Sequence, residues 1–367
     1  MRLKICAAAD FHIGMKFARY EDAVRSALVT ARMDALKRVV DEANRRSCDM
    51  MIIAGDLFDR PNCSQKVVLE TLKCLDNFEG KLVALLPGNH DYFQSGPEGL
   101  WERLSRDAGD RILLCGEARP YDLEVFDLPA VLYPAPCTGK HSATGSIGWV
   151  EGAMKRDGGV FHLGLAHGSI EGISPDFDGR YYPMTRKELE KSGMDLWIVG
   201  HTHSLWTEGN VFVPGTPEPD GFDCRHGGSA WIIELEENRD IQSELVNTGT
   251  FRFEDKALEL RPDRDPVGEI EQLLPEDPSR SLFRLTLRGR LTAENLERVY
   301  SFIETQKGAF FYLQLHDEDL SRQLSREEIE AAYPEGSFPC LLLSALADEE
   351  EPALLNLAWS LIREASE

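Results

Sequence analysis

The sequence predicts an α/β fold in which β-sheets form a sandwich flanked by helices, followed by a small α+β domain. Three observations predict it. Short apolar runs recur through the first part of the chain, stretches with apolar residues at helical spacing lie between them, and the composition changes near residue 250 to a charged segment with few apolar residues. A chain of 367 residues is also long enough for about two domains.

Five apolar runs bounded by turn residues predict the buried strands of the first domain. They are residues 3–9, 50–54, 82–86, 161–166 and 196–199. Helical spacing predicts a long helix over residues 20–44 and shorter helices at residues 69–78 and 185–191. Late strands are expected at residues 210–214 and 229–235, which close a first domain spanning residues 1–245. Helices that alternate with strands in this way are expected to cover a sheet.

A smaller domain is expected after a linker over residues 246–280, where prolines interrupt a charged stretch. Residues 282–287 and 309–315 have the pattern of strands and residues 293–305 that of a helix, which together predict a βαβ unit. This domain is expected to span residues 281–367 and to end in an amphipathic helix over residues 352–364. The apolar side of that helix is expected to pack within its own domain, with docking to a partner protein as the alternative.

Each of the five predicted strands is followed by a segment that contains metal-binding side chains. The segments are Asp10-Phe11-His12, Gly55-Asp56-Leu57-Phe58-Asp59, Gly88-Asn89-His90-Asp91, His167-Gly168 and Gly200-His201-Thr202-His203. In open α/β sheets, ligand-binding groups lie at the carboxyl ends of the strands. Any one segment alone is more often ordinary turn chemistry. Together they hold five of the nine histidines, and they therefore predict one metal site.

The motifs D-x-H, GDxxD, GNHD, H and GHxH, in this order, resemble the signature of the calcineurin-like metallophosphoesterase superfamily over about the first 235 residues. Within the superfamily, residues 9–14, 55–59 and 214–219 are similar to the SbcD-type nucleases that repair DNA ends. The phosphoprotein phosphatases carry GDxVDRG and GNHE instead, whereas this chain has Arg60-Pro61 and Asp91 at those places. The resemblance therefore implies a metallophosphoesterase sandwich with a capping-like second domain, and a DNA exonuclease or endonuclease activity.

The resemblance also implies a site for two divalent metal ions. One ion would be held by Asp10, His12, Asp56 and His203, and the other by Asp56, Asn89, His167 and His201. Mn2+ is expected, with Mg2+ and Zn2+ as alternatives, because oxygen and nitrogen ligands without cysteine suit hard or borderline ions. Asp56 is then the ligand shared by both ions.

His90 is expected to be catalytic rather than a ligand. Its neighbour Asn89 supplies the ligand from this segment, so the imidazole is expected to face the scissile phosphate and to protonate or stabilise the leaving oxygen. Asp59 is expected to orient that imidazole, with an ordinary helix cap as the alternative. Asp91 is expected to brace the loop after the histidine.

The charge of the chain argues against a nucleic-acid substrate. The chain holds 63 acidic and 40 basic residues, a net charge of -23, whereas nucleic-acid-binding proteins usually present a basic face. Bound cations and a local basic patch would soften this conflict. Three hypotheses stay open: the nuclease, a small-molecule or nucleotide phosphodiesterase or phosphatase with the same site, and a metal-bound structural subunit of an ATPase complex.

Partners and location are expected from the resemblance and the composition. The resemblance implies DNA and an SbcC-like coiled-coil ATPase as partners, and homodimers are common among the relatives. Tyr181, Tyr182 and Trp206 are candidates to stack on bases, and Arg225 and His226 to reach a substrate phosphate. We expect a cytoplasmic protein without membrane contact, because there is no secretory signal, no run of roughly 20 apolar residues and no CxxC pair among the eight cysteines.

Overall fold

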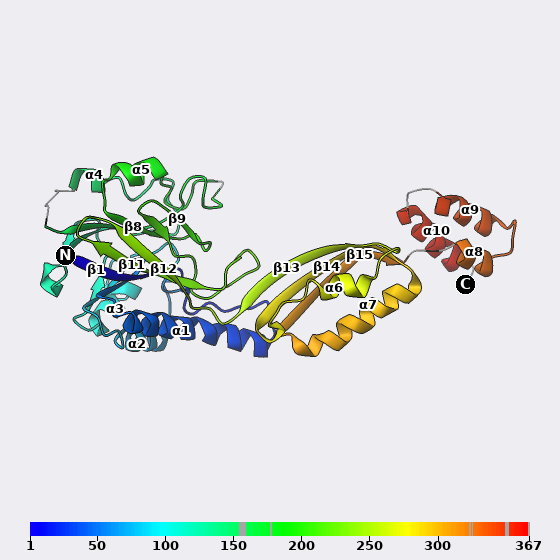
Figure 1. Cartoon of the computed structure of the whole chain (residues 1–367), viewed down its shortest axis with the longest axis horizontal. Helices are drawn as coiled ribbons and strands as arrows, with labels where there is room; N and C mark the ends of the chain where they lie inside the picture. The colour runs from blue at the N-terminus through cyan, green and yellow to red at the C-terminus, as the bar shows by residue number, and fades with distance from the viewer. Residues whose placement is uncertain (154–158, 177, 323, 325, 349–351, 366–367) are drawn as a thin grey trace. The chain divides into compact units, whose positions relative to one another are not determined.

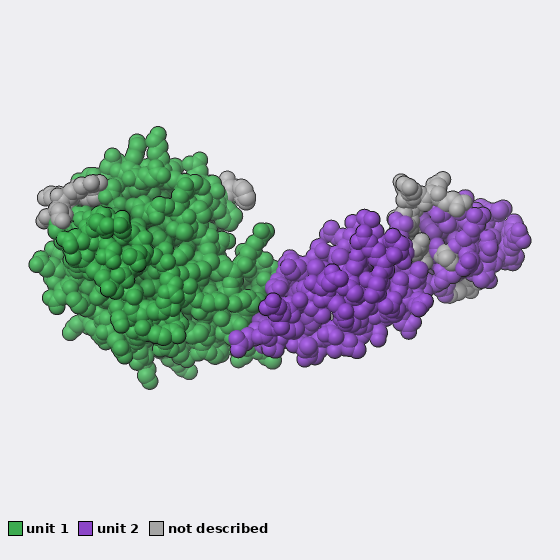
Figure 2. Space-filling model, in the orientation of Figure 1, with its two compact units in different colours: residues 1–253 green, residues 254–367 purple. Residues whose placement is uncertain are grey.

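The computed structural model describes residues 1–153, 159–176, 178–322, 324, 326–348 and 352–365. Two compact units make up the chain, Met1–Phe253 and Glu254–Glu367 (Figure 2). Each unit contains buried apolar clusters of its own. Among the described residues, no helix is both long and apolar enough to cross a membrane.

Two six-stranded sheets form the first unit (Figure 1). In sheet order, the first consists of β12 (Ile241–Asn247), β11 (Ser229–Glu236), β1 (Arg2–Ala8), β2 (Met50–Ile53), β3 (Leu82–Leu85) and β4 (Ile112–Leu114). The second consists of β5 (Tyr121–Asp122), β6 (Ala130–Ala135), β7 (Phe161–His167), β8 (Leu196–Gly200), β10 (Val211–Val213) and β9 (Trp206–Glu208). The α/β sandwich predicted from the sequence is confirmed.

The strands before the metal-binding segments are parallel neighbours. β1 pairs with β2 and β2 with β3 in the first sheet, while β7 pairs with β8 in the second. The carboxyl ends of parallel neighbours lie at the same edge of a sheet, so each sheet brings its segments together. Among the described pairings, the antiparallel ones are β1 with β11 and β11 with β12 in the first sheet, and β5 with β6 and β9 with β10 in the second.

Side-chain alternation along β1 explains how the two sheets and the helices pack. Leu3, Ile5 and Ala7 belong to the apolar cluster that joins the two sheets, whereas Cys6 and Ala8 belong to the cluster that includes the helices. Successive side chains of a strand point to opposite faces, so a strand buried on both faces reads as a continuous apolar run.

Helices cover the outer face of each sheet (Figure 1). On one side lie α1 (Asp22–Arg45), α2 (Gln65–Leu75) and α3 (Leu100–Asp107), and on the other α4 (Val150–Ala153) and α5 (Arg186–Lys191). α2 begins where the side chain of Ser64 accepts a hydrogen bond from the amide of Val67. α5 begins with a capping box between Thr185 and Glu188. A single 3-10 turn, η1 (Glu124–Phe126), lies between β5 and β6.

The second unit contains a three-stranded sheet and five α-helices among its described residues. The sheet has the order β13 (Arg252–Leu260), β14 (Ser281–Leu291) and β15 (Tyr312–Arg322). The α-helices are α6 (Pro266–Glu271), α7 (Ala293–Gln306), α8 (Arg326–Ala332), α9 (Phe338–Asp348) and α10 (Pro352–Glu364), and η2 (Pro278–Arg280) and η3 (Lys307–Ala309) are 3-10 turns. β14, α7 and β15 form the βαβ unit, with the two strands parallel.

Within residues 246–280, for which the sequence predicts a linker, the structure forms β13 and α6. Leu260 and Ile270 are buried in one cluster with residues of β14 and α7, so this charged segment contributes to a core. Asp265 caps α6 by accepting a hydrogen bond from the amide of Gly268, with Pro266 at the first helical position. The charged residues between prolines that suggest a linker, at 261–265 and 276–277, are exposed and follow β13.

The last helix, α10, packs partly within its own unit. Leu355 is buried in a small cluster with residues of α8 and α9. Leu354, Leu357 and Leu361 are instead 45%, 56% and 55% exposed. The helix therefore packs on one side, as the sequence predicts, and leaves three leucines uncovered among the described residues.

Candidate metal centre

The predicted metal ligands lie on turns with an unusual backbone. The angle φ is positive at four of them: 57° at Asp10, 45° at His12, 51° at Asp56 and 92° at His201. Residues with a side chain rarely adopt this left-handed conformation, which concentrates at functional sites. The amide of Asp10 donates to the carbonyl of Gly55 at 3.1 Å, and that of His12 to the carbonyl of Asp56 at 2.9 Å. The turns after β1 and β2 are therefore tied together.

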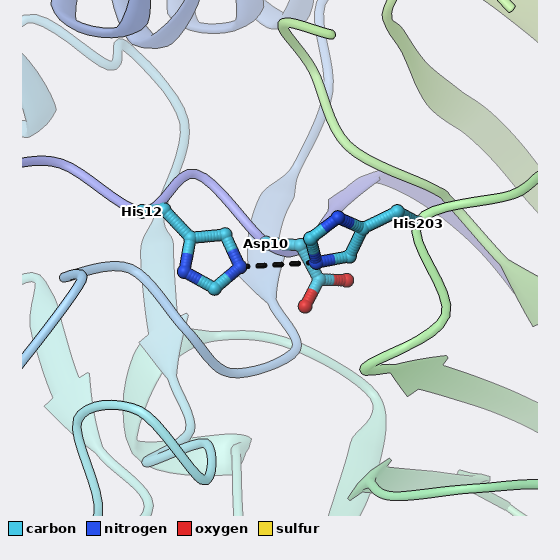
Figure 3. A group of neighbouring side chains, drawn as sticks. All are labelled: Asp10, His12 and His203. Atoms are coloured by element: carbon cyan, nitrogen blue, oxygen red, sulfur yellow. Dashed lines mark hydrogen bonds between the residues drawn. The ribbon is translucent and has the colours of Figure 1, made fainter. Parts of the chain in front are cut away.

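Asp10, His12 and His203 form a first group of ligand atoms, and Figure 3 shows the three side chains converging. Their ligand atoms lie within 4.8 Å of one another, and Nε2 of His12 is 3.1 Å from Nε2 of His203. Nδ1 of His203 lies 3.0 Å from the carboxylate of Asp220, which accepts its hydrogen and leaves the lone pair of the neutral ring on Nε2. Two ring nitrogens that face each other need a proton or a cation between them.

Asn89, His167 and His201 form a second group. Nδ1 of His167 donates to the carbonyl of Ala54 at 2.8 Å, so Nε2 carries the lone pair of the neutral ring. That Nε2 lies 2.9 Å from Oδ1 of Asn89, and Nδ1 of His201 lies 3.0 Å from the same oxygen. The amide nitrogen of Asn89 is buried and has no hydrogen-bond partner among the described residues. Again two electron-pair donors face each other, as ligands of one cation do.

Asp56 lies between the two groups. Its Oδ2 is 3.7 Å from Nε2 of His12 and 3.4 Å from Nε2 of His167. Its Oδ1 accepts a hydrogen bond of 2.8 Å from the main-chain amide of His90. One buried carboxylate thus faces both sets of ring nitrogens, as a bridging ligand must.

Glycines in the motifs leave room for these side chains. A Cβ at Gly88 would lie 2.2 Å from Oδ1 of Asp56, and a Cβ at Gly55 would lie 2.1 Å from Nδ1 of His167. Both distances are far below van der Waals contact. The glycines of the GNHD and GDxxD motifs are therefore required by the close approach of the ligands.

The ionisable groups of the site shift one another's pKa values. Burial raises the pKa of Asp10 to about 6, against the opposing effect of His167 and His203. Burial would also raise the pKa of Asp56, but His167 and His12 outweigh it and hold that pKa well below its ordinary value. Burial would lower the pKa of His203, but Asp220 outweighs it and raises the pKa to about 9. Imidazolium and carboxylate groups thus balance each other, and divalent cations can replace the protons.

His90 lies beside the ligand groups, and its contact with Asp59 differs from the expected one. The ring of His90 meets the ring of His12 edge to face, with centroids 4.7 Å apart. Its Nδ1 is 3.2 Å from the main-chain carbonyl of Asp59. The carboxylate of Asp59 pairs with the guanidinium of Arg60 instead. The side chain is drawn away because the neighbouring arginine offers a charge-assisted partner.

Asp91 is a buried brace, as expected. Its two carboxylate oxygens accept hydrogen bonds from the amides of Phe58, at 3.0 Å, and Gly88, at 2.7 Å. Burial, followed by the charge of Asp56, raises the pKa of Asp91 to about 8. The side chain therefore links the second and third metal-binding segments.

The remaining candidates divide into one residue beside the site and several that are structural or distant. The ring of Tyr181 is half-buried, with its centroid 5.0 Å from that of His201. Tyr182 is buried, and its hydroxyl contacts the main chain at residues 138 and 139. His226 donates to the carbonyl of His203 and accepts from the amide of Gly228, so both of its ring nitrogens are engaged by the main chain. Arg225 is exposed, and Trp206 stacks with Arg186.

Two residues of the site were missed from the sequence. Asp220 contacts His203, and Arg32 of α1, whose side chain is only 1% exposed, lies 3.1 Å from Asp220. Asp220 directly follows the turn at residues 214–219, whose similarity to the SbcD-type nucleases was the only signal that could have pointed to it. Nothing in the local sequence indicates that Arg32 lies near the site, because helical spacing predicts only which face of the helix a residue occupies and not what that face contacts.

These side chains fit a centre for two divalent cations. Carboxylate oxygens, an amide oxygen and imidazole nitrogens are the ligands that Mn2+, Mg2+ and Zn2+ accept, and no cysteine is among them. The fit rests on ring nitrogens and an amide oxygen that converge at 2.9 to 3.1 Å, where a cation can replace a shared proton. Such an arrangement can bind a phosphoryl group and hydrolyse its ester.

Comparisons with known proteins place this geometry in a family. A model described as calcineurin-like phosphoesterase matches residues 3–205. The chain is 24% identical over 269 residues to the uncharacterized metallophosphoesterase YhaO of Bacillus subtilis, covering 69% of this chain and 62% of that protein. It is 23% identical over 259 residues to the DNA double-strand break repair protein Mre11 of Saccharolobus solfataricus, covering 63% of each. The chain thus spans less than two thirds of the length of both relatives.

Among solved structures, a dimetal phosphatase from Danio rerio is similar at 13% identity and a TM-score of 0.37, covering 67% of this chain and 99% of that one. The family model covers more than half of this chain, including every segment that carries a predicted ligand. The chain therefore belongs to the calcineurin-like phosphoesterase family and is a hydrolase of phosphoesters.

Proposed function

We propose that this phosphoesterase is a DNA nuclease of the SbcD type that acts in DNA repair. The observation that carries the proposal is the complete set of site residues in a chain whose relatives include a protein named as a DNA double-strand break repair protein. The substrate bond is then a phosphodiester, and the final acceptor is water.

Two divalent ions, Mn2+ in our proposal, would supply Lewis acidity toward the phosphoryl oxygens and lower the pKa of the attacking water. We assign the ligands of each ion from the two groups of side chains. One ion would be held by Asp10, His12, Asp56 and His203, and the other by Asp56, Asn89, His167 and His201. His167 is the last residue of β7, and the other ligands come from the turns after β1, β2, β3 and β8.

His90 is the proposed catalytic imidazole. Its main-chain amide is held by Asp56 and its Nδ1 by the carbonyl of Asp59, which together fix the plane of the ring. With a hydrogen on Nδ1, Nε2 is free to hold the proton that the leaving oxygen needs. The ring is half-buried at the edge of the ligand groups, so a substrate can reach it.

The proposed partners follow from charge. The net charge of -23 leaves little attraction for DNA, and the nearby arginines are paired, Arg60 with Asp59 and Arg180 with Asp178. We therefore propose that DNA is held mainly by a partner, an SbcC-like coiled-coil ATPase. We also propose a cytoplasmic location, which is supported by eight cysteines that are all free.

An assay with two kinds of substrate tests the function. The protein is incubated with Mn2+, Mg2+ or Zn2+ and either an end-labelled double-stranded oligonucleotide or bis-p-nitrophenyl phosphate. We expect Mn2+-dependent shortening of the oligonucleotide at low salt, lost in the His90→Ala variant. Rapid turnover of the small ester beside intact DNA, in the presence of the candidate ATPase as well, would replace the nuclease by the small-molecule phosphodiesterase.

That second function is favoured by one observation, the acidic charge of the chain, which a small ester tolerates better than a polyanion does. The third hypothesis, a structural subunit that only retains metals, requires no chemistry at His90. It predicts equal activity of the wild type and the His90→Ala variant in every assay.

A further inference from the structure

The outer nitrogen of His203 faces a buried carboxylate that lies outside the predicted ligand set. Oδ2 of Asp220 is 3.0 Å from Nδ1 of His203, and the side chain of Asp220 is 8% exposed. The same carboxylate also contacts the guanidinium of Arg32, which lies on α1. Nη2 of Arg32 lies 3.1 Å from Oδ2 of Asp220, while Nη1 donates to the carbonyl of Phe11 at 2.7 Å. A buried chain of contacts thus runs from the first metal-binding segment through Arg32 and Asp220 to His203.

The loop that carries Asp220 is fixed at two residues that precede it. Oγ1 of Thr216 lies within hydrogen-bonding distance of the carbonyl of Asp10, at 2.9 Å. Glu218 accepts hydrogen bonds from the amides of residues 250 and 251 and pairs with Arg38 at 2.9 Å. The helix α1 therefore supplies two arginines to this one loop, Arg38 at Glu218 and Arg32 at Asp220. Only the second pair contacts a metal ligand.

The tautomer of His203 decides whether it can bind a cation. Its Nε2 is the nitrogen that faces His12 and must carry the lone pair. A neutral imidazole has one hydrogen, and an ionised carboxylate can only accept, so Asp220 places that hydrogen on Nδ1. Carboxylates in this position orient the histidine ligands of metal sites and raise their basicity.

We propose that Asp220 and Arg32 are positioning residues of the metal centre, in which Asp220 fixes the ion-binding tautomer of His203 and Arg32 fixes Asp220. The proposal rests on the proposed function only for the presence of the ions and not for DNA as the substrate. Its effect is confined to the ion that His203 shares with Asp10 and His12. The ion on the side of Asn89 and His201 is left in place.

A competing explanation is that Asp220 supports metal binding only by neutralising the charge of Arg32. A double variant that removes both charges distinguishes this effect from control of the His203 tautomer. Arg32 and Asp220 carry opposite charges, so the removal of Asp220 alone leaves a buried guanidinium close to a cation site. The double variant Arg32→Met, Asp220→Asn removes both charges with little change of volume. If Asp220 acts only by neutralising Arg32, the double variant regains the affinity of the wild type.

The test measures Mn2+ binding to the metal-stripped full chain by calorimetry and by electron paramagnetic resonance. We expect Asp220→Asn to weaken one of the two ions by about 10- to 100-fold, because the amide can donate to Nδ1 and move the ring hydrogen to Nε2. The double variant is expected to stay weakened. Glu218→Gln is the matched control, from the neighbouring arginine pair, and is expected to bind both ions like the wild type.

A spectroscopic readout needs no variant that alters the fold. Nitrogen NMR of the Zn2+-loaded wild type, with the His203 signals assigned by their loss in His203→Gln, is expected to show the hydrogen on Nδ1. A hydrogen on Nε2, two ions bound by Asp220→Asn with wild-type affinity, or full recovery in the double variant would each overturn the proposal. None of these measurements uses DNA, so a failure to cleave DNA would refute the nuclease and leave this inference standing.

Discussion

The ring of His90 is oriented by the main-chain carbonyl of Asp59, 3.2 Å from Nδ1, and not by the carboxylate of that residue. The carboxylate is occupied by Arg60. A main-chain acceptor fixes the ring as well as a side chain does, because it is held by the turn itself. The identity of residue 59 therefore matters less than the position of its backbone, and the two residues make different predictions.

Replacement of His90 by alanine is expected to slow hydrolysis and to leave both ions bound. General acid catalysis by a positioned imidazole contributes about 10²- to 10⁴-fold to a rate, so kcat should fall within that range. The main-chain amide of His90, which holds Asp56, is kept in the variant. His90 also lies in a group with His12 and Asp56 that could itself hold a metal ion. Loss of one of two Mn2+ ions on titration would therefore show that His90 is a ligand.

Replacement of Asp59 by asparagine is expected to change kcat by about 3-fold at most, because the carbonyl that faces His90 is retained and the partly buried pair of Asp59 with Arg60, whose side chains are 13% and 39% exposed, contributes little. The measurement is the steady-state rate at saturating Mn2+ for the wild type and the variant. A fall comparable with that of His90→Ala would show that the carboxylate itself takes part.

The fold was predictable where the strands are continuous apolar runs. The run at residues 3–9 became β1 (Arg2–Ala8), and that at residues 50–54 became β2 (Met50–Ile53). β6 (Ala130–Ala135) was missed because it contains a proline, which normally argues against a strand interior. β4 (Ile112–Leu114) was missed because only three residues form it. Short strands are stabilised by their neighbours in the sheet and not by their own sequence.

The candidate site was predictable as far as its residues follow strands. Asp10, Asp56 and His167 stand directly at or after strand ends, so one topological rule brings them together. Asp220 and Arg32 are far apart in the sequence, and their side chains meet only in the folded unit, where α1 lies beside the loop that carries Asp220. The orientation of Asp59 depends on which of two nearby partners its carboxylate takes. Such contacts arise from tertiary packing, and no periodic pattern in the sequence predicts them.

Replacement of Gly88 by alanine is expected to abolish most activity without unfolding the protein. The added Cβ would lie 2.2 Å from Oδ1 and 2.4 Å from the amide nitrogen of Asp56, so the carboxylate between the two ligand groups must move. A misplacement of about 1 Å at a catalytic centre can cost 10²-fold in rate. Activity and thermal melting are measured together.

Gly96→Ala is a control in the following loop, where a new Cβ meets no atom within 4 Å. Unlike Gly88, that glycine has a positive φ, of 122°, so Gly96→Ala adds backbone strain without a clash near Asp56, and a larger loss of activity in Gly88→Ala is due to the clash. Equal activity of the two variants would contradict the account of Gly88.

Binding of metal ions is expected to release protons near neutral pH. The pKa of His203 is raised to about 9, where Asp220 outweighs burial, and that of His167 is raised to about 9, where Asp56 outweighs burial. Both rings therefore carry an extra proton at pH 7.5, and each must lose it to bind a cation.

The raised pKa values have two consequences, and these have opposite signs as the pH rises. Because these folded-state pKa values lie above the ordinary value of 6.5, the two imidazolium groups stabilise the metal-free fold below pH 6.5, and this contribution is lost as the pH rises through about 9. Metal affinity rises over the same interval, because fewer protons have to be displaced.

Calorimetric titration with Mn2+ at pH 7.5, in two buffers of different ionisation enthalpy, is expected to show release of about two protons. Asp220→Asn removes the carboxylate that raises the pKa of His203, so this variant is expected to release about one proton fewer. A heat of binding that is the same in both buffers would mean that the rings are already neutral before the ions arrive.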